Sequence, residues 1–127
     1  RTASGLLRRQ RLILERVPRA AFSPRLCDEL YTFSNKFAVE ERTHWQRHVD
    51  TNSELHILRG SERQVLGFQL FRFGGTSDPS VRILWGGKLR FDPSIRRLGL
   101  HVICNLVALD GLRSSAGPQP PHGGRAS

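Results

Sequence analysis

The chain has 127 residues, which indicates a single domain with room for a hydrophobic core. Its formal net charge is +9, and only two of its 20 basic residues are lysine. Such a surface attracts nucleic acid, acidic lipid or nucleotide phosphates, although an arginine-rich genome would produce the same bias. No apolar run approaches the roughly 18 residues of a membrane span and no secretory signal is visible, so we expect a cytoplasmic protein with no membrane partner.

The N-terminal residues 1–11 form a basic extension. Residues 1–20 carry six arginines and one acid, Glu15, a composition that also fits an organelle transit peptide. The apolar run Leu12, Ile13 and Leu14 predicts a first buried strand, with a short helix as the alternative.

Two helices are expected next. Ser23 can cap a helix and Pro24 suits its first position. The apolar residues of this helix recur at steps of four, three and four: Leu26, Leu30, Phe33 and Phe37. A second helix is expected over about 40–49, where Trp45 and Val49 lie one turn apart, and a loop follows at 51–53.

The pattern then changes to strands joined by short polar turns. Extended runs cover 54–58, 64–73 and 81–85, and after an interruption at Gly86 and Gly87 the last run resumes over 88–91. Gly67 lies within the second run and indicates a bulge or a close backbone approach. These runs predict an antiparallel meander, and with the helices an α+β fold.

A last helix is expected from residue 95. Its apolar residues recur at steps of four, four and three: Leu98, Val102, Leu106 and Leu109. Gly111 is a stop signal, and residues 113–127 are rich in Pro, Gly and Ser, so we expect a disordered tail there.

The junction of the last strand and this helix carries the main chemical signal. The segment 89–106 reads LRFDPSIRRLGLHVICNL, with Arg96, Arg97 and Gly99 at the helix start. A helix start exposes unpaired N–H groups, glycine permits close approach, and guanidinium groups grip phosphate oxygens. The junction therefore predicts a diphosphate site, although arginines at such turns are usually solvated surface.

The order of these elements and the RRLGL segment resemble the GNAT acetyltransferase superfamily over about residues 12–112. The family's Arg/Gln-x-x-Gly-x-Gly/Ala motif follows a strand and a D/H-P-x-x-R lead-in. Here residues 92–96 read DPSIR and residues 96–101 read RRLGLH, while QVLGFQLFRF resembles the family's third strand. The resemblance implies a partial acyl-CoA N-acyltransferase fold over 12–112, because the family's later strands and last helix are absent.

The resemblance also implies a ligand and its contacts. The ligand would be acetyl-CoA or another acyl-CoA, and the acceptor an amine. The backbone of Leu89 to Phe91 would run beside the pantetheine arm. The diphosphate would lie against Arg96, Arg97, Leu98, Gly99, Leu100 and His101. His101 replaces the motif's final small residue, and the open sheet edge would allow a homodimer.

No catalytic residue is assigned. His56 and Asp92 are candidate bases, but an exposed strand histidine and a turn aspartate are the more ordinary interpretations. His44 and His48 have the i,i+4 spacing of a zinc pair without an obvious third ligand, so no metal site is expected. Cys27 and Cys104 are expected as buried free thiols rather than a disulfide.

Two other functions remain open. A basic RNA- or DNA-binding module would use the net charge and the arginines at 8, 9 and 11. A non-catalytic interaction domain would keep the fold without the coenzyme.

Overall fold

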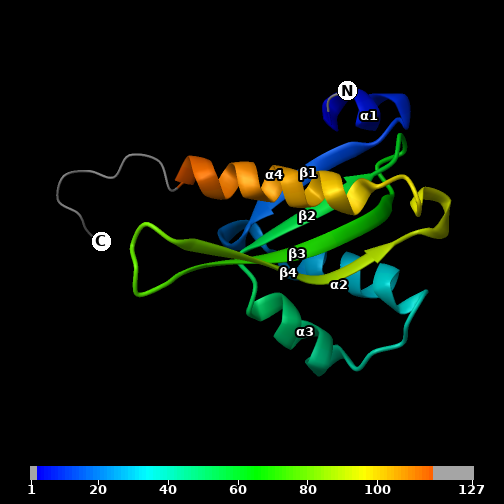
Figure 1. Ribbon diagram of the computed structural model, residues 1–127. Coiled ribbons are helices and arrows are strands. Elements are labelled where there is room, and N and C mark those ends of the chain that lie inside the picture. The colour runs from blue at the N-terminus through cyan, green and yellow to red at the C-terminus, as the bar shows by residue number, and fades with distance from the viewer. Residues whose placement is uncertain (1–2, 116–127) are drawn as a thin grey trace.

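The computed structural model describes residues 3–115 as a four-stranded antiparallel sheet with helices on both faces (Figure 1). The strands lie in the order β1 (Ile13–Pro18), β2 (Glu54–Arg59), β3 (Val65–Gly75) and β4 (Arg82–Phe91). The helices are α1 (Ala3–Arg9), α2 (Pro24–Asn35), α3 (Arg42–Asp50) and α4 (Leu100–Ser115), with short 3-10 turns at Arg19–Ala21 and Pro93–Ile95. The expected α+β meander is confirmed. A first strand forms from Ile13 as expected, but it is largely exposed rather than buried, and Ile13 itself is 60% exposed.

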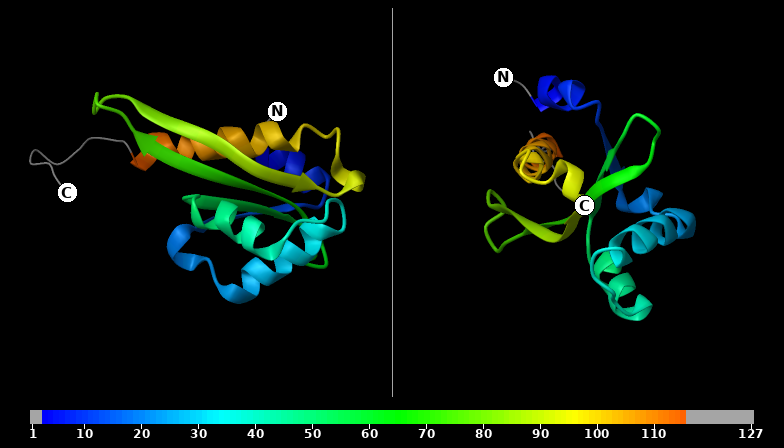
Figure 2. Two further views of the ribbon diagram at one scale, coloured as in Figure 1. Left: turned by 90° about the horizontal axis from the view of Figure 1, so that it is seen from below. Right: turned by 90° about the vertical axis from the view of Figure 1, so that its right-hand side faces the viewer.

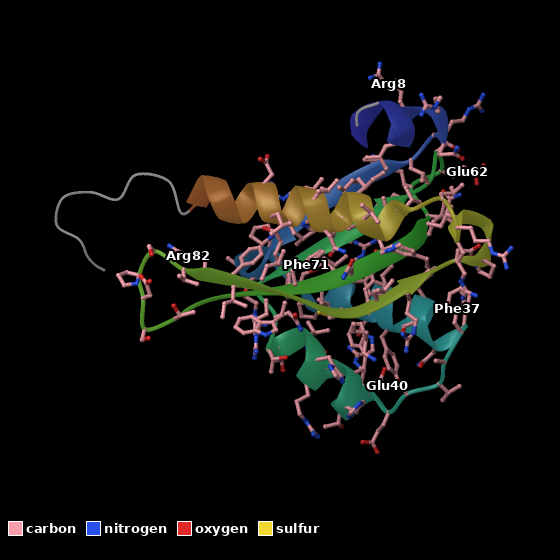
Figure 3. All side chains as sticks on the ribbon, viewed as in Figure 1. Arg8, Phe37, Glu40, Glu62, Phe71 and Arg82 are labelled. Carbon is pink, nitrogen blue, oxygen red and sulfur yellow. The ribbon has the colours of Figure 1, made fainter. Side chains whose placement is uncertain are left out.

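The sheet separates two hydrophobic cores. Helices α2 and α3 cover one face, and α4 runs across the other (Figure 2). Successive strand residues point to opposite faces, so Leu55 and Ile57 of β2 enter the α2–α3 core while Leu58 enters the α4 core. Figure 3 shows Phe37 and Glu40 on the α2–α3 side.

The start of α2 forms as its sequence predicts. The Ser23 hydroxyl accepts a hydrogen bond of 3.1 Å from the Leu26 N–H, and Pro24 takes the first helical position. The expected second helix forms as α3 and buries Trp45 and Val49.

Strand β4 runs through Gly86 and Gly87, so the expected interruption there is wrong. Gln69 pairs with Leu89 while Phe71 pairs with Gly86, which gives β4 one more residue than β3 over this stretch. This extra residue is a β-bulge, which bends the strand without ending it. Gly67 is the close approach that the sequence indicated, because a Cβ there would collide with the Phe91 ring.

Helix α4 differs from its expected form in both bounds and orientation. It begins at Leu100 because Arg97 and Gly99 have φ of 70° and 73°, which an α-helix cannot include, and it continues through Gly111 to Ser115. Its buried residues are Leu100, Ile103, Cys104 and Ala108. The predicted apolar face is therefore wrong in large part: Val102, Leu106 and Leu109 are 48%, 57% and 42% exposed. The helix is apolar on two sides, and the small Cys104 and Ala108 allow the other side to approach the sheet.

The described N-terminal residues form the short helix α1, which lies outside the sheet. Helix α1 lies within the expected basic extension, and the Leu12 N–H donates to the Leu7 carbonyl at 2.8 Å. Residues 116–127 of the expected tail lie outside the described residues. None of the described helices combines the length and apolarity needed to cross a bilayer.

Candidate functional site

The junction between β4 and α4 is held by two hydrogen bonds at Asp92. Its N–H donates to the Leu66 carbonyl at 2.7 Å, which ties the end of β4 to β3. Its carboxylate accepts from the Ser94 N–H at 2.9 Å, which fixes the 3-10 turn and holds the pKa of Asp92 below its ordinary value. These hydrogen bonds therefore fix the backbone that leads from the end of β4 to the start of α4.

The backbone amides of residues 97–101, at this helix start, have no protein acceptor among the described residues. The next amide, that of Val102, bonds to the Gly99 carbonyl at 3.1 Å. A Cβ at Gly99 would meet nothing within 4 Å, so the space beside these amides is open. Five consecutive donors at the positive end of a 16-residue helix form a site suited to an anion.

The outer edge of β4 leads directly to these amides. Because the Asp92 N–H bonds to β3 and antiparallel pairs alternate, Leu89 and Phe91 turn their backbone polar groups away from β3. Their carbonyls accept from Arg90 Nη1 at 2.9 Å and Arg96 Nε at 3.0 Å. Their N–H groups face the open edge.

The structure separates the two arginines that the sequence placed together. Arg96 turns back, with Nε on the Phe91 carbonyl and its guanidinium 5.7 Å from the centre of the Phe37 ring. Arg97 is exposed, and its side chain has no partner among the described residues. The Arg97 guanidinium is therefore available to an anion, whereas the Arg96 side chain is already bonded to the carbonyl at the end of β4.

The remaining expected contact residues have mixed environments. Leu98 and Leu100 pack into the α4 core, and Phe91 is 9% exposed. Leu89 is 36% exposed, and the His101 side chain lies on the surface in the first turn of α4. The side chains of Phe91, Leu98 and Leu100 therefore anchor the junction, and only the backbone groups of these residues remain available for binding.

His56 is fully buried, so its interpretation as an exposed strand histidine is wrong. Its Nε2 lies 2.6 Å from Glu54 Oε2, and Arg16 donates to both oxygens of Glu54 at 3.2 Å. Burial lowers the pKa of His56, although the hydrogen bond to Glu54 opposes that shift. His56 therefore belongs to a polar cluster beneath α4, and it does not face the amides of residues 97–101.

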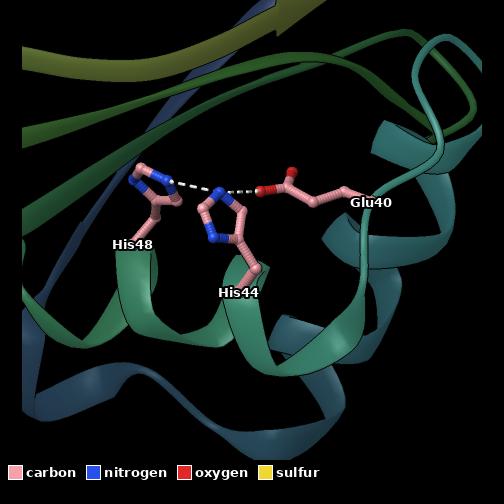
Figure 4. Close-up of side chains that lie close together, drawn as sticks. All are labelled: Glu40, His44 and His48. Atoms are coloured by element: carbon pink, nitrogen blue, oxygen red, sulfur yellow. Dashed lines mark hydrogen bonds and ion pairs between the residues drawn. The ribbon is translucent and has the colours of Figure 1, made fainter.

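A second cluster, missed in the sequence, lies on the α2–α3 side. Glu40, which precedes α3, brings its carboxylate to His44 and His48, so the histidine pair has a third neighbour (Figure 4). Lys88 of β4 reaches the same carboxylate, with Nζ 2.8 Å from Oε1. The sequence carried a signal for Glu40, because it stands four residues before His44 just as His44 stands four before His48. Lys88 could not be found in this way, because it lies 48 residues from Glu40.

Comparison with known proteins identifies the fold. No family model matches the chain, and no curated protein matches it. The crystal structure of a possible acetyltransferase from Clostridium difficile 630 superposes with a TM-score of 0.53 and 9% identity, covering 78% of this chain and 69% of that one. Integron cassette protein VCH_CASS6, from the mobile metagenome of V. cholerae, superposes with a TM-score of 0.50 and 11% identity over 92% and 91%. At these identities the likeness shows the fold alone, and the chain therefore shares the α+β fold of these two proteins.

Proposed function

We propose that this chain is an acyl-CoA-dependent N-acyltransferase domain that holds the coenzyme diphosphate at the start of α4. The observation that carries the proposal is the run of five backbone amides, from Arg97 to His101, without acceptors among the described residues. The acetyltransferase-like fold supports it, because a strand edge and a helix start meet at the same place.

The residues of the junction fit such a ligand. The amides of residues 97–101 and the Arg97 guanidinium would bind the diphosphate, and Gly99 would allow its close approach. The outward N–H groups of Leu89 and Phe91 would hold the pantetheine arm along β4. Bound acyl-CoA would supply an activated thioester, and the chain's contribution would be to position it for an amine acceptor.

The decisive variants change charge at Gly99 while keeping its backbone conformation. Asn and Asp both tolerate positive φ and have nearly the same shape, so Gly99→Asn is the matched control for Gly99→Asp. Calorimetric titration with CoA and acetyl-CoA should show binding to the wild type and weaker binding to the Asn variant, because the Asn side chain occupies part of the open space at Gly99. The Asp carboxylate should weaken binding by at least about tenfold relative to the Asn variant, because its negative charge lies beside the diphosphate and repels it.

A second pair separates the two arginines. Arg97→Gln should weaken coenzyme binding by about tenfold, and Arg96→Gln should weaken it less, because Arg96 already bonds to the protein.

Equal coenzyme affinity in Gly99→Asp and Gly99→Asn would refute the proposed diphosphate site. Oligonucleotide binding with a steep salt dependence, unchanged by Gly99→Asp, would favour the nucleic-acid module instead. If the chain binds neither the coenzyme nor an oligonucleotide, the remaining hypothesis is a non-catalytic interaction domain.

A further inference from the structure

The cluster of Glu40, His44 and His48 has the dimensions of a metal site. His44 Nε2 lies 3.2 Å from Glu40 Oε2 and 3.3 Å from His48 Nε2 (Figure 4). All three ligand atoms lie within 4.8 Å of one another. Two ligands at zinc's usual bond lengths and a tetrahedral angle stand about 3.3 Å apart. Two of the three separations therefore match an edge of a zinc tetrahedron. The third, between Glu40 and His48, is at most 4.8 Å and would shorten as these side chains turn onto an ion.

Local structure holds the three side chains in place. His44 and His48 lie one turn apart on α3, so their rings share one face of the helix. The Glu40 N–H donates to Asn35 Oδ1 at 3.0 Å, and its carbonyl accepts from the Tyr31 hydroxyl at 2.6 Å. Glu40 is therefore fixed to α2 on both sides of its Cα, and the cluster does not depend on a freely moving carboxylate.

The cluster contains one carboxylate, that of Glu40, and two positive side chains, Lys88 and Arg47, lie near it. Burial raises the pKa of Glu40, but Lys88 and the two imidazoles more than offset this and hold it below its ordinary value. Burial and the positive charge of Lys88 lower the pKa of His48. Lys88 Nζ lies 2.8 Å from Oε1, which leaves Oε2 for an ion.

We propose that Glu40, His44 and His48 bind one divalent zinc-type ion through Glu40 Oε2 and the two Nε2 atoms. Two imidazoles and one carboxylate favour zinc and its neighbours over magnesium or calcium. A pocket of about 260 Å³, lined by His44, Arg47, His48 and Thr51, adjoins the cluster. Three protein ligands beside a pocket leave a fourth coordination position for water or a small anion, as in catalytic zinc sites.

The test is a calorimetric titration of the full chain, without a histidine tag, with zinc chloride. The wild type should bind one ion, and cobalt in its place should give the visible absorption of a tetrahedral site. His44→Gln and His48→Gln should each bind at least about tenfold more weakly. The His44 side chain is 54% exposed, so that variant keeps the fold. His101→Gln, which changes a surface histidine on α4, is the matched control and should bind like the wild type.

A variant of Lys88 tests whether zinc binds at Glu40 and the two histidines, because Lys88 lies beside the Glu40 carboxylate. Replacement of its ammonium in Lys88→Met removes a positive charge beside the ion, so zinc should bind about tenfold more tightly. Absence of one-to-one binding in the wild type would overturn the proposal. Affinity unchanged by His48→Gln, or not increased by Lys88→Met, would also overturn it. None of these readouts uses acyl-CoA, so the result is independent of the proposed function.

Discussion

At the scale of single residues, Cys27 and Cys104 lie in the two different cores, on opposite faces of the sheet, and both are free. Burial raises the pKa of Cys104 to about 12 and also raises that of Cys27. We therefore predict that neither thiol reacts with an aromatic disulfide reagent at pH 8 in the folded protein. Both should react in urea, about a hundredfold or more faster. Fast labelling of a thiol in the native state would contradict the burial of that residue.

His56 is a second residue whose environment has a measurable consequence. Its folded pKa is lowered by burial, so the unfolded chain takes up a proton at higher pH than the folded one. Stability from neutral His56 is complete above the unfolded pKa near 6.5 and is lost as the pH falls towards the folded pKa. Urea unfolding at pH 7.5 and 5.5 should show less stability at the lower pH. His56→Gln should reduce this slope, by at most about 1.4 kcal/mol per pH unit. An unchanged slope would mean that the pKa of His56 is the same in the folded and unfolded chain, which would contradict its shift by burial.

At the scale of elements, the orientation of α4 can be tested through two of its leucines. Leu100 is 1% exposed and Leu106 is 57% exposed, although the sequence pattern assigned Leu106 to the buried face. Leu100→Ala should cost about 2–5 kcal/mol of unfolding free energy through lost burial and a cavity. Leu106→Ala should change it by less than about 1 kcal/mol. Denaturant unfolding of both variants measures the difference, and a larger loss in Leu106→Ala would reverse the assigned face.

The pairing of β3 with β4 depends on the missing side chain of Gly67. A Cβ there would collide with the Phe91 ring and lie 3.3 Å from the Arg90 carbonyl. Gly67→Ala should therefore destabilise the fold by about 1–3 kcal/mol. Gly75→Ala is the matched control, because a Cβ at Gly75 meets nothing within 4 Å. Thermal unfolding should show a lower Tm for the first variant alone.

At the scale of the whole molecule, β4 forms one edge of the four-stranded sheet and carries exposed Trp85 and Leu89. Unpaired strand edges are templates for another strand, so we propose that two copies of the coenzyme-free chain pair along β4. Acyl-CoA would use the same outward N–H groups and should therefore compete with this pairing. Size-exclusion chromatography with light scattering should show a dimer. Leu89→Pro should give a monomer, since it removes an N–H that faces the open edge while sparing the bonds to β3. A monomeric wild type at high concentration would contradict this pairing.

The sequence alone determined the elements whose signals are local. Ser23 and Pro24 marked the start of α2, alternation and polar turns marked the strands, and the RRLGL segment marked a helix start with free amides. Each of these depends on residues a few positions apart, which is the range over which capping, periodicity and turn chemistry act.

Only the tertiary structure decided which surfaces meet. Both sides of α4 are apolar, and packing against the sheet chose the side with Cys104 and Ala108. The Arg96 side chain bonds to the Phe91 carbonyl at the end of β4. The Glu40 carboxylate forms an ion pair with Lys88, which lies on a strand far away in the sequence. These outcomes depend on strand register and close packing between segments far apart in the chain, which periodicity along one segment does not encode.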